Sequence, residues 1–315
     1  MSVQVKNTPQ KLYLLGHPIA HSASPTMYNA IYEHLGLPWR YDLMDCETES
    51  AAKTFLDARD FLSINITTPY KPLALHVATA SAASAKLARG ANVLIRKGEA
   101  LIAYNTDGQG CVAYLEREGV CFRGASVAVC GTGPTALAIV HAVSIAGARE
   151  VVLLSRDKER SSKVLKAYVE AFGKLAYATI NLPAVSSRQR SFREAYEKTK
   201  FKYGSYTTST QAISGADIII DATSLGMRPH DPAPFDPSLF RENQFAFDVV
   251  YGHGETAFCA EARKAGCEVR DGQGMLVAQA AITVQTVCDI AEIALDEAFF
   301  DFDSLFSFLS DASGF

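Results

Sequence analysis

The chain has 315 residues, which at about 150 residues per domain is enough for two domains or one large one. Apolar residues make up 48% and charged residues 20%, and the formal net charge is −4 with an isoelectric point near 6.0. This composition is typical of a globular protein with a sizeable core. It lacks the basic field that attracts nucleic acid or an anionic membrane, so we expect neither as a partner.

The sequence also argues against targeting segments and metal sites. The N-terminal residues have no apolar segment of the signal-peptide type, and no run of 18 or more apolar residues occurs. The seven cysteines are scattered and form no C-x-x-C pair, which indicates reduced thiols and a cytoplasmic protein. The histidines lack the spacing of a ligand set, so we expect no metal.

In the first third of the chain, short apolar segments alternate with amphipathic ones, which predicts an α/β fold with mainly parallel sheets. The predicted strands cover 11–16, 39–44 and 61–66, and the predicted helices cover 25–35, ended by Gly36, and 48–58. Residues 91–105 read as a hairpin that turns at Lys97 and Gly98.

The second part of the chain begins on a predicted helix at about 108–118. A strand, a glycine turn, a helix and a strand then follow within residues 125–156, the size of one βαβ unit. The polar residues 180–211 are interpreted as an insertion or a long surface excursion. A long apolar helix is predicted at 275–294. Beyond it, apolar residues at helical spacing predict a helix that docks onto the core (Phe302, Leu305, Phe306 and Leu309).

The glycine turn reads G-x-G-x-x-A, from Gly131 through Gly133 to Ala136. Between a strand and a helix this pattern is typical of a dinucleotide site, because glycines allow the pyrophosphate to approach the helix N-terminus. Arg156 directly follows the second strand and Arg160 lies one helical turn on, which favours the 2′-phosphate of NADP. Asp157 is the alternative, since an acidic residue there would bind the ribose of NAD.

Three earlier segments carry polar groups to the predicted ends of strands. Because the residue before proline avoids the α region, the segment before Pro25 should be extended, with the hydroxyls of Ser22 and Ser24 on one side. Lys71 precedes Pro72 at a helix N-terminus, whose partial positive charge disfavours an ammonium ion and suits a base or proton relay. A carboxylate from Asp107 opposite Lys71 would hold that lysine in place; helix N-caps are the alternative roles of Ser24 and Asp107.

Six ordered motifs over about 260 residues resemble the shikimate dehydrogenase family. They are HSASP (21–25), NITTPYK (65–71), YNTDGQG (104–110), DATSLGM (221–227), DVVYGHGETAF (248–258) and GQGMLVAQA (272–280). The resemblance implies a two-domain α/β fold, with an N-terminal substrate-binding catalytic domain over 1–107 that the C-terminal helices 272–315 complete. It further implies a Rossmann-like NADP-binding domain over 108–271.

Carried over to this sequence, the resemblance implies Lys71 and Asp107 as the catalytic pair. The implied substrate contacts are Ser22, Ser24, Thr67, Asn92 and Gln279. The cofactor-binding residues expected from the glycine turn, the basic segment and the motifs are Gly131, Gly133, Pro134, Thr135, Ser155, Arg156, Arg160, Thr223, Met227, Tyr251 and Gly272. Three positions depart from the family pattern: Val93 replaces a threonine, Pro134 removes one backbone N–H from the glycine turn, and His253 replaces a proline.

The leading hypothesis is an NADP-dependent shikimate dehydrogenase of the aromatic biosynthetic pathway, which reversibly reduces 3-dehydroshikimate. Asp157 and the altered substrate residues support a second one, a quinate/shikimate dehydrogenase that uses NAD or NADP. A third, from another class, is a catalytically silent relative that senses a metabolite, motivated by the altered glycine turn. A small-molecule substrate is expected in each case, and the protein is expected to be a monomer or a homodimer.

Overall fold

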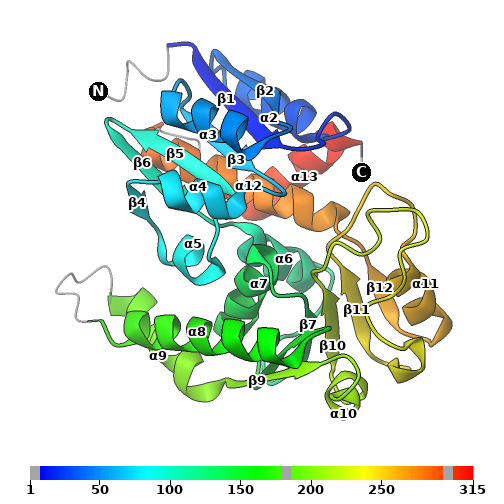
Figure 1. The fold of residues 1–315 in the computed structure, drawn as a ribbon. Helices are drawn as coiled ribbons and strands as arrows, with labels where there is room; N and C mark the ends of the chain where they lie inside the picture. Colours follow the sequence, from blue (N-terminus) through cyan, green and yellow to red (C-terminus); the bar gives the residue numbers. More distant parts are fainter. Residues whose placement is uncertain (1–7, 179–185, 294–300, 315) are drawn as a thin grey trace. The chain divides into compact units, whose positions relative to one another are not determined.

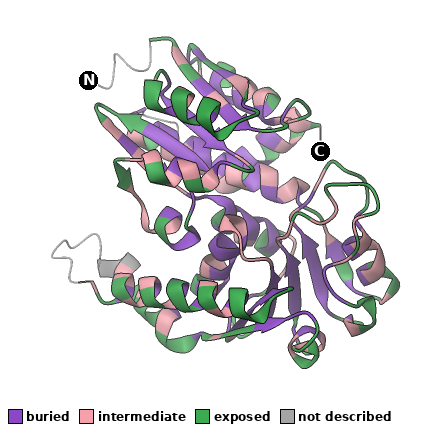
Figure 2. Cartoon of the chain, in the orientation of Figure 1, coloured by how far each residue is buried: buried purple, intermediate pink, exposed green. Residues whose placement is uncertain are grey.

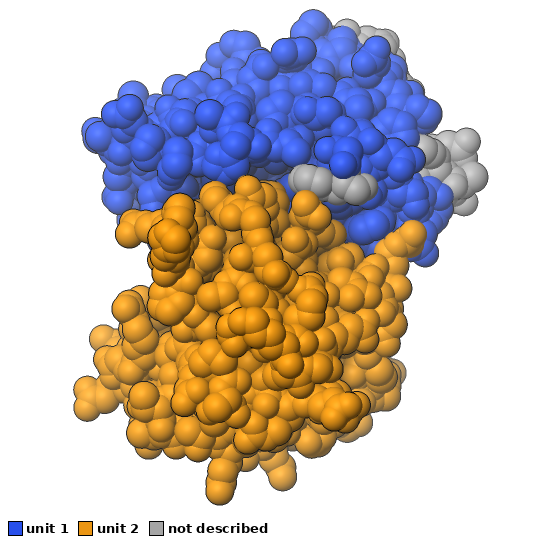
Figure 3. Space-filling view, turned by 90° about the vertical axis from the view of Figure 1, so that its right-hand side faces the viewer, with its two compact units in different colours: residues 1–110, 276–315 blue, residues 111–275 orange. Residues whose placement is uncertain are grey.

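The computed structural model describes residues 8–178, 186–293 and 301–314 (Figure 1). The chain forms two compact units, residues 1–110 with 276–315 (unit 1) and residues 111–275 (unit 2), coloured separately in Figure 3. Each unit has its own six-stranded sheet and its own helices, so the predicted two-domain α/β fold is confirmed.

The sheet of unit 1 has the order β2-β1-β3-β5-β6-β4 and is mixed. Strand β1 is parallel to both neighbours, whereas β5 is antiparallel to β3 and to β6. The strands are β1 (Gln10–Gly16), β2 (Trp39–Asp45), β3 (Ser63–Ile66), β4 (Ala80–Ser81), β5 (Val93–Lys97) and β6 (Ala100–Tyr104). The helices are α2 (Ser24–His34), α3 (Glu49–Ala58), α4 (Lys71–Val77), α5 (Ala83–Ala88), most of α12 (Gln273–Ile290) and α13 (Phe302–Ser313).

The predicted hairpin and the predicted C-terminal helix of unit 1 are both present, and the hairpin turn lies one residue later than expected. The predicted hairpin is β5–β6, but its turn is at Gly98 and Glu99, because Lys97 pairs with Ala100 and Gly98 supplies the positive φ of 59°. The predicted C-terminal helix is α13, and Leu305 and Leu309 on its inner face are fully buried. This helix packs on α2, where the rings of His34 and Phe308 lie 4.9 Å apart, so its docking onto the core is confirmed.

The sheet of unit 2 has the order β12-β11-β10-β7-β8-β9, and every pair in it is parallel. Strands β7, β10 and β11 are buried along their whole length (Figure 2), which explains their continuous apolar runs. The strands are β7 (Ser126–Cys130), β8 (Glu150–Ser155), β9 (Lys200–Ser205), β10 (Ile218–Asp221), β11 (Phe245–Asp248) and β12 (Glu268–Arg270). The helices are most of α6 (Asp107–Arg117), then α7 (Pro134–Ile145), α8 (Lys158–Ala176), α9 (Ser186–Lys198), α10 (Thr210–Ser214), the 3-10 turn η2 (Pro237–Leu239) and α11 (Ala257–Lys264).

The interpretation of residues 180–211 as an insertion was wrong for β9, which is the edge strand of the unit 2 sheet and pairs with β8. Residues 179–185 lie outside the described part of the chain. An edge strand has a single neighbouring strand and is less covered than a central one, so exposed residues such as Lys200 and Lys202 conceal its pattern. Its far end is anchored by the buried Ser161 hydroxyl, which donates to the carbonyl of Gly204 at 2.7 Å.

Candidate active site

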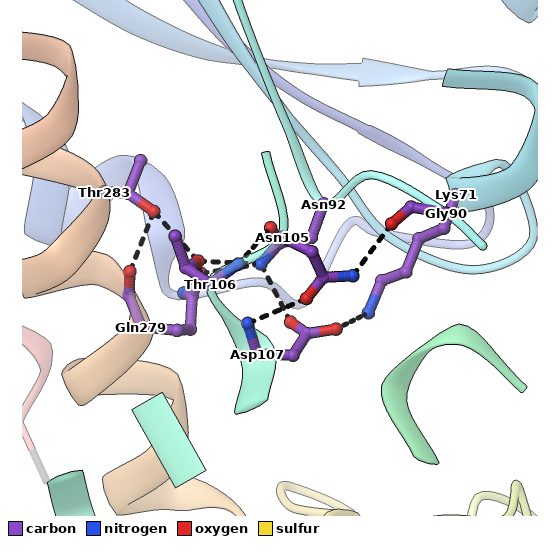
Figure 4. A network of polar contacts seen from close by, with 8 residues as sticks. All are labelled: Lys71, Gly90, Asn92, Asn105, Thr106, Asp107, Gln279 and Thr283. Atoms are coloured by element: carbon purple, nitrogen blue, oxygen red, sulfur yellow. Dashed lines mark hydrogen bonds and ion pairs between the residues drawn. The ribbon is translucent and has the colours of Figure 1, made fainter. Parts of the chain in front are cut away.

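Lys71 and Asp107, both residues of unit 1, are the first residues of two helices and form an ion pair (Figure 4). Lys71 is the first residue of α4, directly before Pro72, and Asp107 is the first residue of α6. The Lys71 Nζ and Asp107 Oδ2 atoms are 2.6 Å apart, and the two side chains are 15% and 7% exposed. The carboxylate therefore holds an amine in a sheltered position, as a proton-transfer group requires.

Asn92 binds the other oxygen of the same carboxylate. Its Nδ2 donates to Asp107 Oδ1 at 2.8 Å and to Thr106 Oγ1 at 2.9 Å, and its Oδ1 accepts from the Thr106 backbone N–H at 2.8 Å. An amide nitrogen has two hydrogens, so both are used within the protein. Asn92 thus orients Asp107 toward Lys71, in addition to any contact that it makes with a ligand.

The network continues onto α12 through hydroxyl groups (Figure 4). Thr106 Oγ1 lies 3.2 Å from Thr283 Oγ1, and the Thr283 hydroxyl donates to the carbonyl of Gln279 at 2.8 Å. Gln279 itself lies one helical turn before Thr283, and its Nε2 donates to the carbonyl of Leu276 at 2.9 Å. The Gln279 Oε1 is 3.5 Å from Thr106 Oγ1, which places this amide at the rim of the network.

Backbone contacts hold the two helix starts together. The Asn105 side chain donates to the carbonyl of Gly90 at 2.9 Å and accepts from the Asp107 N–H at 3.0 Å. The Ala91 N–H donates to the carbonyl of Lys71 at 2.9 Å. The segments that carry Lys71, Asn92 and Asp107 are thereby joined by buried hydrogen bonds, which preorganise the pair.

The two serines of HSASP are neighbours, but not for the predicted reason. The Ser22 and Ser24 hydroxyls are 3.2 Å apart, and the Ser22 hydroxyl accepts from the Ser24 N–H at 3.2 Å. The segment is not extended: Ala23 is αR with φ −76° and serves as the N-cap of α2, and Ser24 is the first helical residue. The expected extended segment and the alternative N-cap role of Ser24 were both wrong, because a local turn closes on the Ser22 hydroxyl.

Thr67 directly follows β3 and lies beside the end of β1. Its backbone N–H donates to the carbonyl of Leu15 at 2.9 Å. A Cβ atom added at Gly16 would lie only 2.2 Å from Thr67 Cγ2, so glycine is required there for this close approach. Since the loop that begins after Gly16 carries Ser22 and Ser24, all three predicted hydroxyls follow the carboxyl ends of the neighbouring parallel strands β1 and β3.

The glycine turn of unit 2 follows β7 and has the form that a dinucleotide needs. Gly131 has a φ of 109°, and a Cβ atom there would lie 2.7 Å from the carbonyl oxygen of Ala222. A Cβ atom at Gly133 would meet no atom within 4 Å among the described residues, so the space over the N-terminus of α7 is open. Pro134 is the first residue of α7, as expected, with Thr135 next. This open helix start fits a pyrophosphate.

The basic segment after β8 borders this turn. Arg160 Nε donates to Thr132 Oγ1 at 3.0 Å, and Arg156 is exposed. The Asp157 carboxylate is the N-cap of α8, where it accepts from the Glu159 N–H at 2.8 Å, and the buried Ser155 hydroxyl donates to the carbonyl of Asp157 at 2.5 Å. The acidic side chain is therefore engaged in capping, and the guanidinium groups are the charges available to a ligand.

The remaining predicted cofactor residues follow β10, β11 and β12 in unit 2. Thr223 accepts from the Leu225 N–H at 3.1 Å, and Met227 is 41% exposed. Tyr251 lies in the turn after β11. A Cβ atom at Gly272 would lie 2.1 Å from the carbonyl oxygen of Val249, so the chain after β12 packs directly against that turn.

Sequence reasoning missed the roles of Asn105, Thr106 and Thr283. The first two lie inside YNTDGQG, so the motif marked the segment without indicating which side chains hold Asp107. The spacing of four residues between Gln279 and Thr283 on a helix was the available signal for Thr283.

Comparison with known proteins identifies the family. Residues 14–94 match the family model described as the shikimate dehydrogenase substrate binding domain. The shikimate dehydrogenase (NADP(+)) of Moorella thermoacetica is 32% identical over 89% of this chain and 88% of its own length. The chain belongs to the shikimate dehydrogenase family. A second relative, the shikimate dehydrogenase (NADP(+)) of Methanothrix thermoacetophila, is 32% identical over 86% of this chain and 89% of its own length.

Solved structures share the fold of this chain. Shikimate 5-dehydrogenase from Thermus thermophilus, in complex with NADP(H) and shikimate, superposes with a TM-score of 0.73 at 25% identity and covers 96% of this chain and 99% of its own. A quinate dehydrogenase from Corynebacterium glutamicum, in complex with NAD, shares the fold with a TM-score of 0.73 at 24% identity, covering 96% of this chain and 100% of its own. None of the described helices has the length and apolar character needed to cross a membrane.

Proposed function

We propose that this protein is an NADP-dependent shikimate dehydrogenase, an oxidoreductase that reversibly reduces 3-dehydroshikimate to shikimate. The contact of 2.6 Å between Lys71 and Asp107, with Asn92 on the second carboxylate oxygen, is the observation that carries the proposal. An amine and a carboxylate held this way can accept a hydroxyl proton in one direction and return it in the other.

Unit 1 is the proposed substrate-binding unit. Shikimate is a small acid with several hydroxyl groups, and it needs a site rich in hydroxyls and amides. Such groups come from Ser22, Ser24 and Thr67, which follow the carboxyl ends of β1 and β3. Asn92 within the Lys71–Asp107 network and Gln279 at its rim supply amides. Lys71 handles the proton of the reacting hydroxyl, while Asp107 holds the amine and keeps its charge compensated.

Unit 2 is the proposed cofactor-binding unit, and its residues fit NADP. The open α7 N-terminus fits the pyrophosphate, and Arg156 and Arg160 offer guanidinium groups to the 2′-phosphate. When bound, NADP supplies the hydride chemistry of the reaction. The protein's own contribution is to position the cofactor and exclude competing reactions.

The test is a matrix of initial rates with shikimate and quinate, each with NADP and with NAD. We expect kcat/KM to be highest for shikimate with NADP. A preference for quinate or for NAD would replace the proposal with the quinate/shikimate dehydrogenase hypothesis. Stoichiometric ligand binding with no turnover in any of the four pairs would replace it with the metabolite sensor.

We also propose a cytoplasmic location. None of the seven cysteines, all of which lie in the described part of the chain, forms a disulfide bond; six are buried and Cys121 is exposed. Free thiols persist in a reducing compartment.

A further inference from the structure

Two aspartates that the proposed mechanism does not use lie side by side in the core of unit 2. Asp221 is the last residue of β10 and Asp248 the last of β11, and they are register partners in the parallel sheet. Their exposed fractions are 1% and 0%. Two like charges buried at neighbouring positions repel each other strongly, so one of them must be neutral.

The hydrogen bonds identify the neutral member. Asp248 accepts from the Val250 N–H at 3.0 Å on one oxygen and from the Thr256 hydroxyl at 2.6 Å on the other. Asp221 Oδ1 accepts from the Thr223 N–H at 2.9 Å, but its buried Oδ2 has no hydrogen-bond partner among the described residues. A buried ionised carboxylate needs donors on both oxygens far more than a neutral acid does, so the charge belongs on Asp248 and Asp221 is the protonated member.

Electrostatics agrees with this assignment. Burial, followed by the charge of Asp248, raises the pKa of Asp221 from its ordinary 3.8 to about 8. Burial also raises the pKa of Asp248, to about 6. Asp221 is thus the member that keeps its proton at neutral pH.

The two thiols and the phenol that face the pair do not titrate in the same range. Cys130 at the end of β7, Tyr206 after β9 and Cys259 on α11 all have a pKa raised by burial, that of Cys259 to about 12. Arg156 faces Tyr206, and Asp271 faces Asp248 and Cys259.

The pair lies directly under the glycine turn. Ala222, next to Asp221, donates its N–H to the carbonyl of Cys130 at 2.9 Å, and its own carbonyl oxygen is the atom that a Cβ at Gly131 would strike at 2.7 Å. Asp221 also holds Thr223, and Asp248 holds the turn that leads to Tyr251. Any charge on Asp221 therefore acts beside the place where unit 2 receives an anionic ligand.

We propose that Asp221 is a neutral carboxylic acid that positions the turn after β10 for the dinucleotide, and that its ionisation weakens dinucleotide binding by adding a negative charge under the glycine turn. The inference rests on the proposed NADP site. It makes Asp221 a positioning residue and gives the cofactor affinity a pH dependence of its own.

Two measurements on the full chain test it. The first is the free energy of unfolding without cofactor from about pH 4 to about pH 9.5, for wild type and Asp221→Asn. Because the folded state binds a proton that the unfolded chain has lost above about pH 4, this contribution to stability declines as pH rises and is gone above about pH 8. The Asn side chain keeps the Thr223 hydrogen bond and cannot ionise, so Asp221→Asn should lose this decline and equal or exceed wild type at pH 7 and above.

The second measurement is the dissociation constant of NADPH over the same alkaline range, where the 2′-phosphate stays fully charged. We expect it to rise roughly three- to tenfold between about pH 7 and 9.5 in wild type, from like-charge repulsion, and to stay level in Asp221→Asn. The matched control is Asp236→Asn, because the exposed Asp236 makes the same turn bond, to the Ser238 N–H at 2.9 Å. That control should keep the wild-type profile.

The outcomes separate the two proposals. Identical pH profiles for wild type and Asp221→Asn, or an Asp221→Asn that is less stable than wild type at pH 7, would overturn the inference. If the stability profiles of wild type and Asp221→Asn differ but neither protein binds NADPH at any pH, the proton on Asp221 is supported and the proposed NADP site is wrong. If Asp221→Asn fails to fold, Asp248→Asn serves instead: without the Asp248 charge, the Asp221 transition should move to lower pH, and an unmoved transition would contradict the pairing.

Discussion

Asp107 in unit 1 and Asp221 in unit 2 are both buried, yet their surroundings assign them opposite chemical states. Asp107 has Lys71 on one oxygen and Asn92 on the other, so its charge is compensated and both of its oxygens face a donor. Asp221 has one backbone donor, one oxygen without a partner among the described residues and a second carboxylate beside it. The difference shows that donors and neighbouring charges, more than burial itself, decide whether a carboxyl group serves as an anion or as a neutral acid.

Removing the Lys71 amine that pairs with Asp107 has the largest expected effect on activity. Lys71→Met should lower kcat roughly a thousandfold while KM for shikimate changes by no more than a few-fold, because the lost proton transfer belongs to the transition state. Steady-state kinetics measure both. Lys11→Met is the matched control, since Lys11 pairs with Asp60 at the same 2.6 Å but on the surface, and it should leave kcat unchanged. A retained kcat with a raised KM would reduce Lys71 to a binding residue.

A buried base without a partner charge should make unit 2 sensitive to acid. Burial among Phe172 and its neighbours lowers the pKa of His141 from its ordinary 6.5 to about 4. Between about pH 6.5 and 4 the unfolded chain binds a proton that the folded chain excludes, so stability falls as pH falls, by about 3 kcal/mol over the window. Urea unfolding at several pH values should show this slope reduced in His141→Gln. If the slope of unfolding free energy against pH is the same in wild type and His141→Gln, His141 is not the source of the acid sensitivity.

The surface charges of unit 2 should matter for cofactor choice. Arg156→Ala should raise KM for NADP roughly ten- to a hundredfold, because a hydrogen bond to a charged group is worth about 1.5–3 kcal/mol. NAD carries no phosphate there, so its kcat/KM should hardly change. If the wild-type protein prefers NAD and Arg156→Ala leaves KM for NADP unchanged, Arg156 does not bind the 2′-phosphate.

The smallest effect is expected for Asp157, whose carboxylate caps α8. Asp157→Ala should cost about 1 kcal/mol of unfolding free energy, the usual value of an N-cap, and leave the NADP to NAD preference in place. Thermal unfolding and kcat/KM with both cofactors measure the two parts. A selective loss of NAD-linked activity would instead make Asp157 a ribose ligand.

Much of the fold was predictable because local patterns specify it. The apolar runs of β7 and β8 flank a glycine turn, and Pro134 starts α7 where proline is tolerated. Strand β9 escaped prediction because an edge strand is less covered than a central one and its exposed polar residues interrupt the apolar pattern. The Ser22–Ser24 contact was foreseen, but it arises from a local turn in which Ala23 is helical, and the rule for residues before proline did not anticipate that turn.

The sequence by itself determined which groups are present and where each lies along the chain: an amine before Pro72, a carboxylate at the start of a helix, two glycines after a strand and two arginines one turn apart. These are local facts, since motif spacing and helix starts depend on near neighbours. Tertiary structure alone decided which of these groups meet. Strand order made Asp221 and Asp248 neighbours across 27 positions of sequence. Helix packing brought Thr283 on α12 to Thr106, which also binds Asn92. The physical reason is that a carboxyl group's charge depends on donors and charges in space, and only the packed sheet fixes those distances.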